Sequence, residues 1–349
     1  MWSVGLIHEG MVKIETNGVF YNSKMRFCRD ADMVVFRNLD SRIYLDALAA
    51  TGIRGIRATI EAGFTVEFND IDPRAVEVIK KNLELNGIKA VVHNEDAAIL
   101  MRRKKYDHVD LDPFGSPVEF LESACYSARR YISVTATDTA ALCGSATTSG
   151  LRKYSTYAVK TEYYHETGLR VLIGRIVSTL TKYDKFAEVL VSWAKEHYYR
   201  VHLKIGRSSK KAGEIYEKIG YIFHCRKCGN RFAKSVFEAE SCECDCGSRF
   251  IRLGPLWIGE LHNADFVKKL DKKGETGKLF ETIEGELETI TYYELHNLTR
   301  MLRVSPPPIQ RILEKLIDEG YRASRTRFSG TSFKTDANID EIKRIILSL

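Results

Sequence analysis

The chain has 349 residues, enough for two domains that each bury a core, and its 44% apolar and 28% charged residues are ordinary for a globular protein. No run of 18 apolar residues occurs, and the polar amino terminus is unlike a signal peptide, so we expect a cytoplasmic protein without a membrane-spanning segment. The 53 basic and 46 acidic side chains give a net charge of +7, which permits a polyanionic partner without demanding one.

The first clear element is a strand followed by a turn of small residues and a helix. The strand runs from Ile43 to Asp46, and the turn after it contains Gly52 and Gly55. The residues that follow, through Glu61, have the spacing of a helix. Small residues let the backbone approach a ligand, and the first turn of a helix offers free N–H groups. The turn lacks the first glycine of a dinucleotide fingerprint, so the sequence gives little support for nicotinamide binding.

A second strand begins at Phe64 and ends on Asp70. In a Rossmann-like unit, a carboxylate at this position can bind both ribose hydroxyls. Asp70 could instead cap the helix predicted over 74–86, but Asp72 stands directly before Pro73 and is the better N-cap. We therefore expect Asp70 to be the ribose ligand.

Two further strands also end close to acids. The strand over 90–93 is followed by Asp96, and the strand over 106–111 is followed by Asp112. Any one of these acids is more often a turn former than a ligand. Because parallel strands end along one edge of a sheet, we expect Asp70, Asp96 and Asp112 to line a single crevice.

The segment after the fourth strand, Asp112-Pro113-Phe114, is the most informative in the chain. Pro113 removes a backbone donor and stops the strand. Asp112 can then accept a hydrogen bond from an amino group at the carboxyl end of the sheet, while Phe114 offers a stacking face for the ring that carries the amine. The alternative is a strand-terminating turn with a buried aromatic residue. The strand-end acids upstream favour the ligand-binding interpretation.

The middle of the chain alternates between helical and strand-like spacing. The spacing predicts helices over 163–182 and 186–196 and a strand over 199–205. The composition of 206–213 predicts a loop. We therefore divide the chain into a first domain over 1–222 and a second over 223–349.

Five of the eight cysteines form the patterns Cys225-x-x-Cys228 and Cys242-x-Cys244-x-Cys246. Glycine follows Cys228 and Cys246, as in zinc knuckles, and in a reducing compartment the spacing favours a thiolate zinc site over disulfides. Three ligands are expected to be Cys225, Cys228 and Cys246. The fourth is Cys244 or Cys242, and Cys244 is preferred because it leaves the shorter closed turn. Four thiolates leave no open position, which predicts a structural role.

The second domain continues with amphipathic helices predicted over 292–302 and 309–319 and a basic strand-turn-strand segment. This order is similar to a winged helix, a frequent nucleic-acid platform, although a purely structural appendage is an equal alternative. Basic residues also cluster over 102–105, 207–211 and 322–327, where they either form solvated surface or contact phosphates.

Several motifs together carry a family resemblance. They are D-A-L-A-A-T-G-I-R-G, N-D-I-D-P, E-D-A and D-P-F-G-S-P in that order, with Phe20-Tyr21-Asn22, Arg29-Asp30 and Gly254-Pro255-Leu256-Trp257 outside them. The chain resembles class I S-adenosylmethionine-dependent methyltransferases, and more narrowly the tRNA guanine-26 N2,N2-dimethyltransferases. It departs from the family pattern at Ser23, where proline is usual, and at Cys28, where asparagine is usual.

The resemblance implies an α/β fold, with a Rossmann-like class I methyltransferase domain and a smaller zinc-containing α/β C-terminal domain that binds tRNA. The implied reaction transfers one or two methyl groups from S-adenosylmethionine to the exocyclic N2 of guanine 26, with no membrane and no protein partner. Arg29 and Arg54 would reach the methionine carboxylate, the backbone at Gly52 would lie near the methionine part, and Asp96 with Ala97 would lie at the adenine.

The same resemblance implies that Phe20 and Phe114 clamp the purine while Asp112 accepts its N–H. Two alternatives stay open. One is an N-methyltransferase acting on a guanine or adenine of rRNA or DNA, which would share the crevice. The other is a non-catalytic zinc-containing RNA-binding protein, which would have no reason to keep a cofactor crevice.

Overall fold

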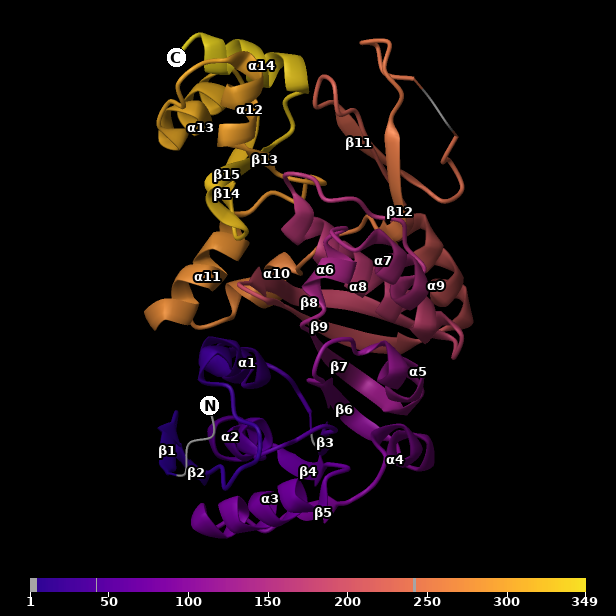
Figure 1. The fold of residues 1–349 in the computed structure, drawn as a ribbon, viewed down its shortest axis with the longest axis vertical. Coiled ribbons are helices and arrows are strands. Elements are labelled where there is room, and N and C mark those ends of the chain that lie inside the picture. Colours follow the sequence, from indigo (N-terminus) through magenta and orange to yellow (C-terminus); the bar gives the residue numbers. More distant parts are fainter. Residues whose placement is uncertain (1–4, 42, 241–242) are drawn as a thin grey trace.

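A seven-stranded sheet lies at the centre of the computed structural model, which describes residues 5–349 except 42, 241 and 242 (Figure 1). The strand order is β5-β4-β3-β6-β7-β9-β8. The strands are β3 (Ile43–Asp46), β4 (Thr65–Asn69), β5 (Val91–His93), β6 (Tyr106–Leu111), β7 (Ala128–Ala136), β8 (Lys185–Lys195) and β9 (Tyr198–Arg207). The first five in spatial order are parallel, and β9 and β8 add antiparallel pairs. This is the predicted Rossmann-like sheet.

Helices cover both faces of the sheet because adjacent residues of each buried strand point to opposite sides. Tyr44 packs into one apolar cluster and Leu45 into the other. One face is covered by α1 (Arg26–Phe36), α2 (Ile53–Ala62) and α3 (Pro73–Leu85). The other is covered by α4 (Ala97–Arg103), α5 (Val118–Ser127) and α8 (Tyr164–Thr181).

Shorter elements complete the first half of the chain. The amino-terminal hairpin consists of β1 (Leu6–Glu9) and β2 (Val12–Glu15), and η1 (Ser23–Met25) leads into α1. The segments α6 (Thr139–Leu142) and α7 (Thr147–Tyr154) precede α8, and α9 (Ser209–Glu214) and η2 (Ile215–Lys218) follow β9. Neither the amino-terminal hairpin nor α1 is among the elements predicted from the sequence.

Two predictions in the middle of the chain are wrong. The expected helix over 186–196 is strand β8, which pairs with β9 along its length. Residues 189–193 are buried in succession, and a strand covered on both faces has a continuous apolar pattern that periodicity does not separate from a buried helix. Within the expected loop over 206–213, helix α9 forms because the Ser208 hydroxyl accepts a hydrogen bond from the Lys211 N–H.

A second sheet of three strands carries the cysteine cluster. It consists of β10 (Ile219–His224), β11 (Arg231–Ser235) and β12 (Ile251–Trp257), in the order β11-β10-β12. Strand β12 packs on α8 at Gly174, where an added Cβ would lie 3.0 Å from the Trp257 nitrogen. Residues Ile219 and Ile222 thus share an apolar cluster with the main sheet, and the division of the chain at residue 222 stays a prediction.

The C-terminal region forms a third sheet with its own apolar cluster. Its strands are β13 (Tyr293–Glu294), β14 (Ala323–Thr326) and β15 (Ser329–Thr335), in the order β13-β15-β14. The helices are α12 (Leu295–Leu302), α13 (Ile309–Asp318) and α14 (Ile339–Leu347), and α10 (Ala264–Lys268) with α11 (Gly274–Gly285) connects this region to β12. The predicted order of two helices followed by a hairpin is confirmed.

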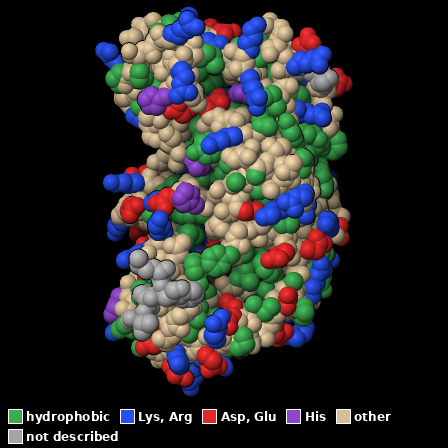
Figure 2. Space-filling view, in the orientation of Figure 1, with side chains coloured by type: hydrophobic (Ala, Val, Ile, Leu, Met, Phe, Trp, Pro, Cys, Tyr) green, Lys and Arg blue, Asp and Glu red, His purple; other side chains and the backbone are tan. Residues whose placement is uncertain are grey.

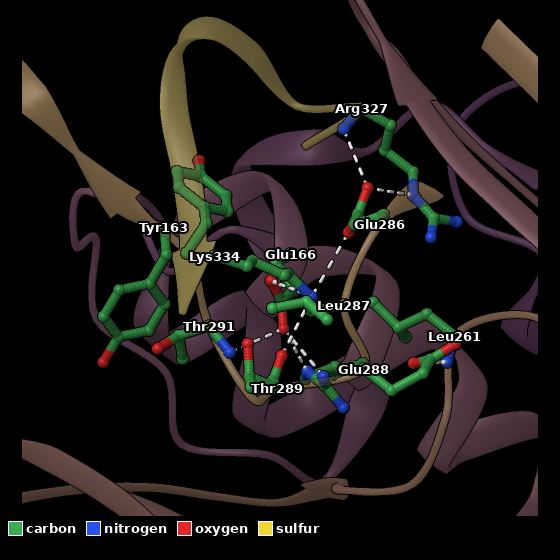
Figure 3. A network of polar contacts seen from close by, with 12 residues as sticks. Tyr163, Glu166, Leu261, Glu286, Leu287, Glu288, Thr289, Thr291, Arg327 and Lys334 are labelled. Carbon is green, nitrogen blue, oxygen red and sulfur yellow. Dashed lines mark hydrogen bonds and ion pairs between the residues drawn. The ribbon is translucent and has the colours of Figure 1, made fainter. Parts of the chain in front are cut away.

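A buried ionic network joins the C-terminal hairpin to the main body (Figure 3). The Lys334 ammonium lies 3.3 Å from Glu166 of α8 and 3.2 Å from Glu286. Arg327 donates to Glu286 and to the Ser192 carbonyl of β8. All three charged side chains of the Lys334–Glu286–Arg327 group are at most 1% exposed. The hairpin is therefore fixed against α8 and β8.

No helix in the described part of the chain is long and apolar enough to cross a membrane.

Candidate active site

A cleft of about 700 Å³ opens at the carboxyl ends of β3, β4 and β6. The acid that ends or follows each of these strands lines it, namely Asp46, Asp70 and Asp112. The parallel register brings these ends to one edge, as the sequence predicted for Asp70 and Asp112.

The turn between β3 and α2 forms the floor beside Asp70. Ala50 and Gly52 have φ values of 49° and 77°, so the backbone bends sharply where only small side chains fit. The Asp70 carboxylate accepts hydrogen bonds from the Ala50 N–H at 2.8 Å and the Asp72 N–H at 2.9 Å. Asp72 caps α3 by accepting from the Arg74 N–H, which confirms its predicted capping role.

Three predicted cofactor contacts lie outside the cleft lining. Asp96 is exposed, and its carboxylate caps α4 by accepting from the Ala98 and Ile99 N–H groups. Ala97 is buried in the core, and Gly52 packs behind the turn near Ile79. Asp96 caps α4 and does not line the cleft, so its predicted place beside Asp70 and Asp112 stays a prediction.

Asp112 is held by a guanidinium from α2. Arg54, which is 4% exposed, pairs with Asp112 and also with Asp32 of α1. Asp32 in turn accepts from Arg200 of β9 at 2.9 Å, and Arg200 binds Asp110 through two hydrogen bonds of 2.7 Å. A chain of alternating charges thus runs from the core to Asp112 in the cleft.

The buried acids of this chain respond differently to their surroundings. Burial raises the pKa of Asp110, but the adjacent Arg200 outweighs it and holds that pKa well below its usual range. Burial raises the pKa of Asp46 well above its usual range, and the charges of Asp110 and Asp112 add to this effect. Arg200 thus favours the ionised form of Asp110, whereas burial and the neighbouring acids favour the neutral form of Asp46.

The aromatic side chains meet at the mouth of the cleft. The Phe20 and Phe114 ring centroids are 4.1 Å apart at an interplanar angle of 62°. Phe114 is 75% exposed, so the alternative of a buried aromatic residue after the strand is wrong. Pro113 is buried beneath it. The two rings touch, so a planar base can stack between them only after they separate.

Arg29 reaches the cleft from α1 with a partner that the sequence did not predict. Its Nε and Nη2 each donate to Glu9 of the amino-terminal hairpin at 2.6 Å. Burial raises the pKa of Glu9, but hydrogen bonds and the charge of Arg29 dominate and lower it to about 2. The pair fixes the Arg29 guanidinium at the edge of the cleft.

Sequence reasoning missed several residues that line the cleft. Glu196 and His197 form the turn between β8 and β9, and Tyr198 is the first residue of β9. Because residues 186–196 were predicted as a helix, nothing pointed to a turn between two strands at the sheet edge. Asp32 and Arg200 were also missed, although charged residues within apolar helical and strand patterns are a usable signal.

The four cysteine thiols Cys225, Cys228, Cys244 and Cys246 come together between β10, β11 and β12, with all sulfurs within 4.8 Å of one another. The Cys225–Cys246 and Cys228–Cys244 sulfurs are 3.5 and 3.4 Å apart. Sulfurs that each lie about 2.3 Å from one tetrahedral ion are roughly 3.8 Å apart, so the cluster fits a zinc ion. Cys242 lies outside the described residues.

Comparisons with known proteins agree with this geometry. Residues 6–347 match the family described as N2,N2-dimethylguanosine tRNA methyltransferase. The tRNA (guanine(26)-N(2))-dimethyltransferase of Archaeoglobus fulgidus is 50% identical over 345 residues, which covers 98% of both chains. The enzyme of the same name from Methanosphaerula palustris is 38% identical, covering 93% of this chain and 90% of the relative.

A solved structure is also similar over nearly the whole chain. It is the complex of Trm1 from Pyrococcus horikoshii with S-adenosyl-L-methionine, with a TM-score of 0.90 and 34% identity. The match covers 98% of this chain and 99% of that one.

Proposed function

Because this chain belongs to the N2,N2-dimethylguanosine tRNA methyltransferase family, we propose that the cleft at the ends of β3, β4 and β6 is where it methylates guanine 26 of tRNA. The reaction transfers methyl groups from S-adenosylmethionine to the exocyclic N2. The observation that carries the assignment of the site is the pairing of Asp112 with Arg54 beside two aromatic rings in the one cleft that also holds Asp70.

The Asp70 carboxylate in the cleft has room to bind the ribose of the cofactor. A carboxylate has about four acceptor sites. The Asp70 carboxylate uses two of them on the Ala50 and Asp72 N–H groups, so it keeps two for ribose hydroxyls. When bound, S-adenosylmethionine supplies an electrophilic methyl group on a positively charged sulfur.

Other chain residues are assigned to the remaining parts of the cofactor. Arg29 and Arg54 line the cleft and would face the methionine carboxylate with the N–H groups that their acid partners leave free. Gly52 supports the turn that forms the floor at the methionine part. Asp96 and Ala97, at the start of α4, are the proposed neighbours of the adenine.

Asp112 is the proposed catalytic residue. The lone pair of guanine N2 is shared with the ring, so the amine is a weak nucleophile. Asp112 would accept one N–H of this amine, which raises the electron density on N2, and would stabilise the positive charge that develops on nitrogen as it gains a methyl group. Arg54 pairs with the Asp112 carboxylate and orients it for this contact.

Phe20 and Phe114 are proposed to hold the guanine ring. Their contact closes the cleft mouth, and both are at least 44% exposed, so they have room to move apart and stack on the two faces of a base. A base within a folded tRNA reaches such a pocket only by leaving its stack. The buried Pro113 fixes the backbone between Asp112 and Phe114.

The second part of the proposal concerns the C-terminal region. We assign a structural zinc ion to Cys225, Cys228, Cys244 and Cys246, since four thiolates leave no open coordination position. The region that follows would hold the tRNA, because its helices and basic hairpin have the order of a winged helix.

Mass analysis of nucleosides tests the proposed function. Unmodified tRNA is incubated with the protein and S-adenosylmethionine, digested, and analysed for N2-methyl- and N2,N2-dimethylguanosine. We expect the dimethylated nucleoside from the natural sequence and none from a transcript with adenine at position 26. Methylation of the control transcript, or of rRNA in place of tRNA, would show that the site acts on another substrate.

A further inference from the structure

A second cavity, of about 260 Å³, lies between the cysteine cluster and the C-terminal helices. We call it the junction pocket. Its walls come from the loop before α8, from the segment between β10 and β11, and from β13, α12 and the start of α14, including Lys160, His224, Arg226, Asn297, Met301 and Ile339. Figure 1 shows the strand β11 and the helices α12 and α14 on either side of this junction.

The acidic side chains of the junction pocket are already engaged. Glu162 pairs with Arg231, and Arg231 also donates to the Tyr292 carbonyl at 2.6 Å. The Glu294 carboxylate caps α12 through the Asn297 N–H and accepts from the Thr331 hydroxyl. These acids therefore present little free negative charge to a ligand.

The cations at the rim are not engaged in the same way. Lys160 and Arg226 are exposed, and neither has an acidic partner among the residues that the structure describes. The Lys160 ammonium lies 5.0 Å from the Tyr164 ring centroid. Lys and Arg side chains are visible on both parts of the molecule that flank the junction (Figure 2). The rim therefore favours an anion.

The interior of the junction pocket combines an apolar wall with polar groups. Leu298, Met301 and Ile339 form the wall, and Met301 is 43% exposed. His224 is 6% exposed, and its buried Nδ1 has no hydrogen-bond partner in the described part of the chain. A buried polar atom without a partner is costly, which points to a ligand that hydrogen-bonds there.

We propose that the junction pocket receives one unpaired nucleotide of the bound tRNA, at a second site in addition to the cleft. The base lies against the apolar wall with its edge toward His224 and Asn297, and the phosphate lies at Lys160 and Arg226. This rests on the proposed function, because the ligand is part of the same tRNA.

The size and chemistry of the junction pocket select this ligand. Its volume is little more than a third of that of the cleft, which must hold a guanine together with a cofactor, so it suits one base. Proteins recognise unpaired RNA bases by stacking or apolar contact on the faces and by hydrogen bonds at the edges. Phosphates bind exposed cations. The rim offers two such cations, Lys160 and Arg226, while the acids of the pocket are engaged with other groups.

Binding of unmodified tRNA to variants of the full chain tests the proposal. Met301→Glu places a negative charge at the wall and should weaken tRNA binding about tenfold, while S-adenosylmethionine binding stays within twofold of wild type. Leu347→Glu makes the same change at an exposed apolar residue of α14 outside the pocket and should change tRNA binding less than threefold. Met301→Leu, which keeps the volume, should bind normally.

The salt dependence adds a second measurement. The double variant Lys160→Ala with Arg226→Ala should lower the slope of log affinity against log salt by about two, since each phosphate contact contributes about one. Ultraviolet cross-linking of the wild-type complex should place a nucleotide adduct on the peptide that contains Asn297 and Met301.

The outcomes separate this inference from the proposed function. If wild type methylates guanine 26 but Met301→Glu binds tRNA as tightly as Leu347→Glu, with an unchanged melting temperature and zinc content, the junction pocket holds no nucleotide. An adduct confined to cleft peptides leads to the same conclusion. If wild type does not methylate tRNA at all, the proposed function is wrong. The reason to expect a tRNA nucleotide in the junction pocket is then lost as well.

Discussion

Two buried networks of charge in this molecule differ in one respect. Under the cleft, a chain of ion pairs runs in the order Asp110, Arg200, Asp32, Arg54 and Asp112. Its last member, Asp112, has a side chain that is 27% exposed. At the junction with the C-terminal hairpin, Glu166, Lys334, Glu286 and Arg327 are all at most 1% exposed. The first network reaches a cavity and the second is closed on all sides.

The network at the cleft can position a group for chemistry, whereas the closed network can only hold the C-terminal hairpin in place. An ion pair that ends at a cleft can orient an ionised group toward a substrate. A closed ion pair can only fix the elements that carry it, and breaking it leaves an uncompensated buried charge. The following experiments test this contrast.

The largest effect is expected for Asp112→Ala. Loss of a positioned proton acceptor typically costs about two to four orders of magnitude in rate, and we expect this loss in single-turnover methyl transfer. The dissociation constant of S-adenosylmethionine, measured by calorimetry, should change little. Asp112→Asn keeps the shape without the charge and should be similarly slow. Near-normal turnover in either variant would show that Asp112 is not the acceptor.

Glu286→Gln tests the closed network. Because it leaves Lys334 and Arg327 short of their shared acid, we expect a loss of about 3 to 5 kcal/mol in the free energy of unfolding, measured with urea. The matched control Glu284→Gln, in a partly exposed pair with Lys272, should cost less than about 1 kcal/mol. Equal stability of the two variants would contradict a structural role for Glu286.

The same residue predicts a dependence of stability on pH. Burial raises the pKa of Glu286, but the charges of Arg327 and Lys334 outweigh it and lower the pKa from its ordinary 4.5 to about 2. A depressed pKa stabilises the fold above the unfolded value, so this contribution is complete above about pH 4.5 and is lost as the pH falls toward 2. Wild type should therefore lose more stability than Glu286→Gln between pH 5 and pH 3. Parallel curves for the two proteins would be evidence against this assignment.

A smaller effect is expected for Asp70→Ala. Removing hydrogen bonds to a charged acceptor should weaken S-adenosylmethionine binding by about 1.5 to 3 kcal/mol. Since Asp70 also accepts from Ala50 and Asp72, the control Asp72→Ala reports how much of the loss comes from the α3 start alone. An unchanged affinity in folded Asp70→Ala would leave Asp70 as a turn residue.

The smallest effect on cofactor binding is expected for Cys228→Ser. If the four thiols hold zinc, the wild-type protein should contain close to one equivalent, and the variant should lose metal and tRNA affinity. S-adenosylmethionine binding should stay within about twofold, because the cysteines lie outside the cleft. Elemental analysis that finds no zinc in protein purified without chelators would overturn the site.

The sequence alone determined the elements whose signals are local. The strands that lead to Asp70 and Asp112, the Asp72 cap and the spacing of Cys225 and Cys228 all depend on neighbours within a few residues. Strand-forming residue composition, helix capping and metal-ligand turns are properties of short segments. The family motifs have the same character, since each is a continuous run.

The tertiary structure decided what depends on packing between distant segments. Strand β8 is a strand because it pairs with β9 and is covered on both faces, which erases the pattern that would have identified it. Asp32 of α1 pairs with both Arg54 of α2 and Arg200 of β9, and these three residues lie far apart in the sequence. Burial and ion pairing arise only when separate segments come together, so a single segment does not show which charged residues will pair.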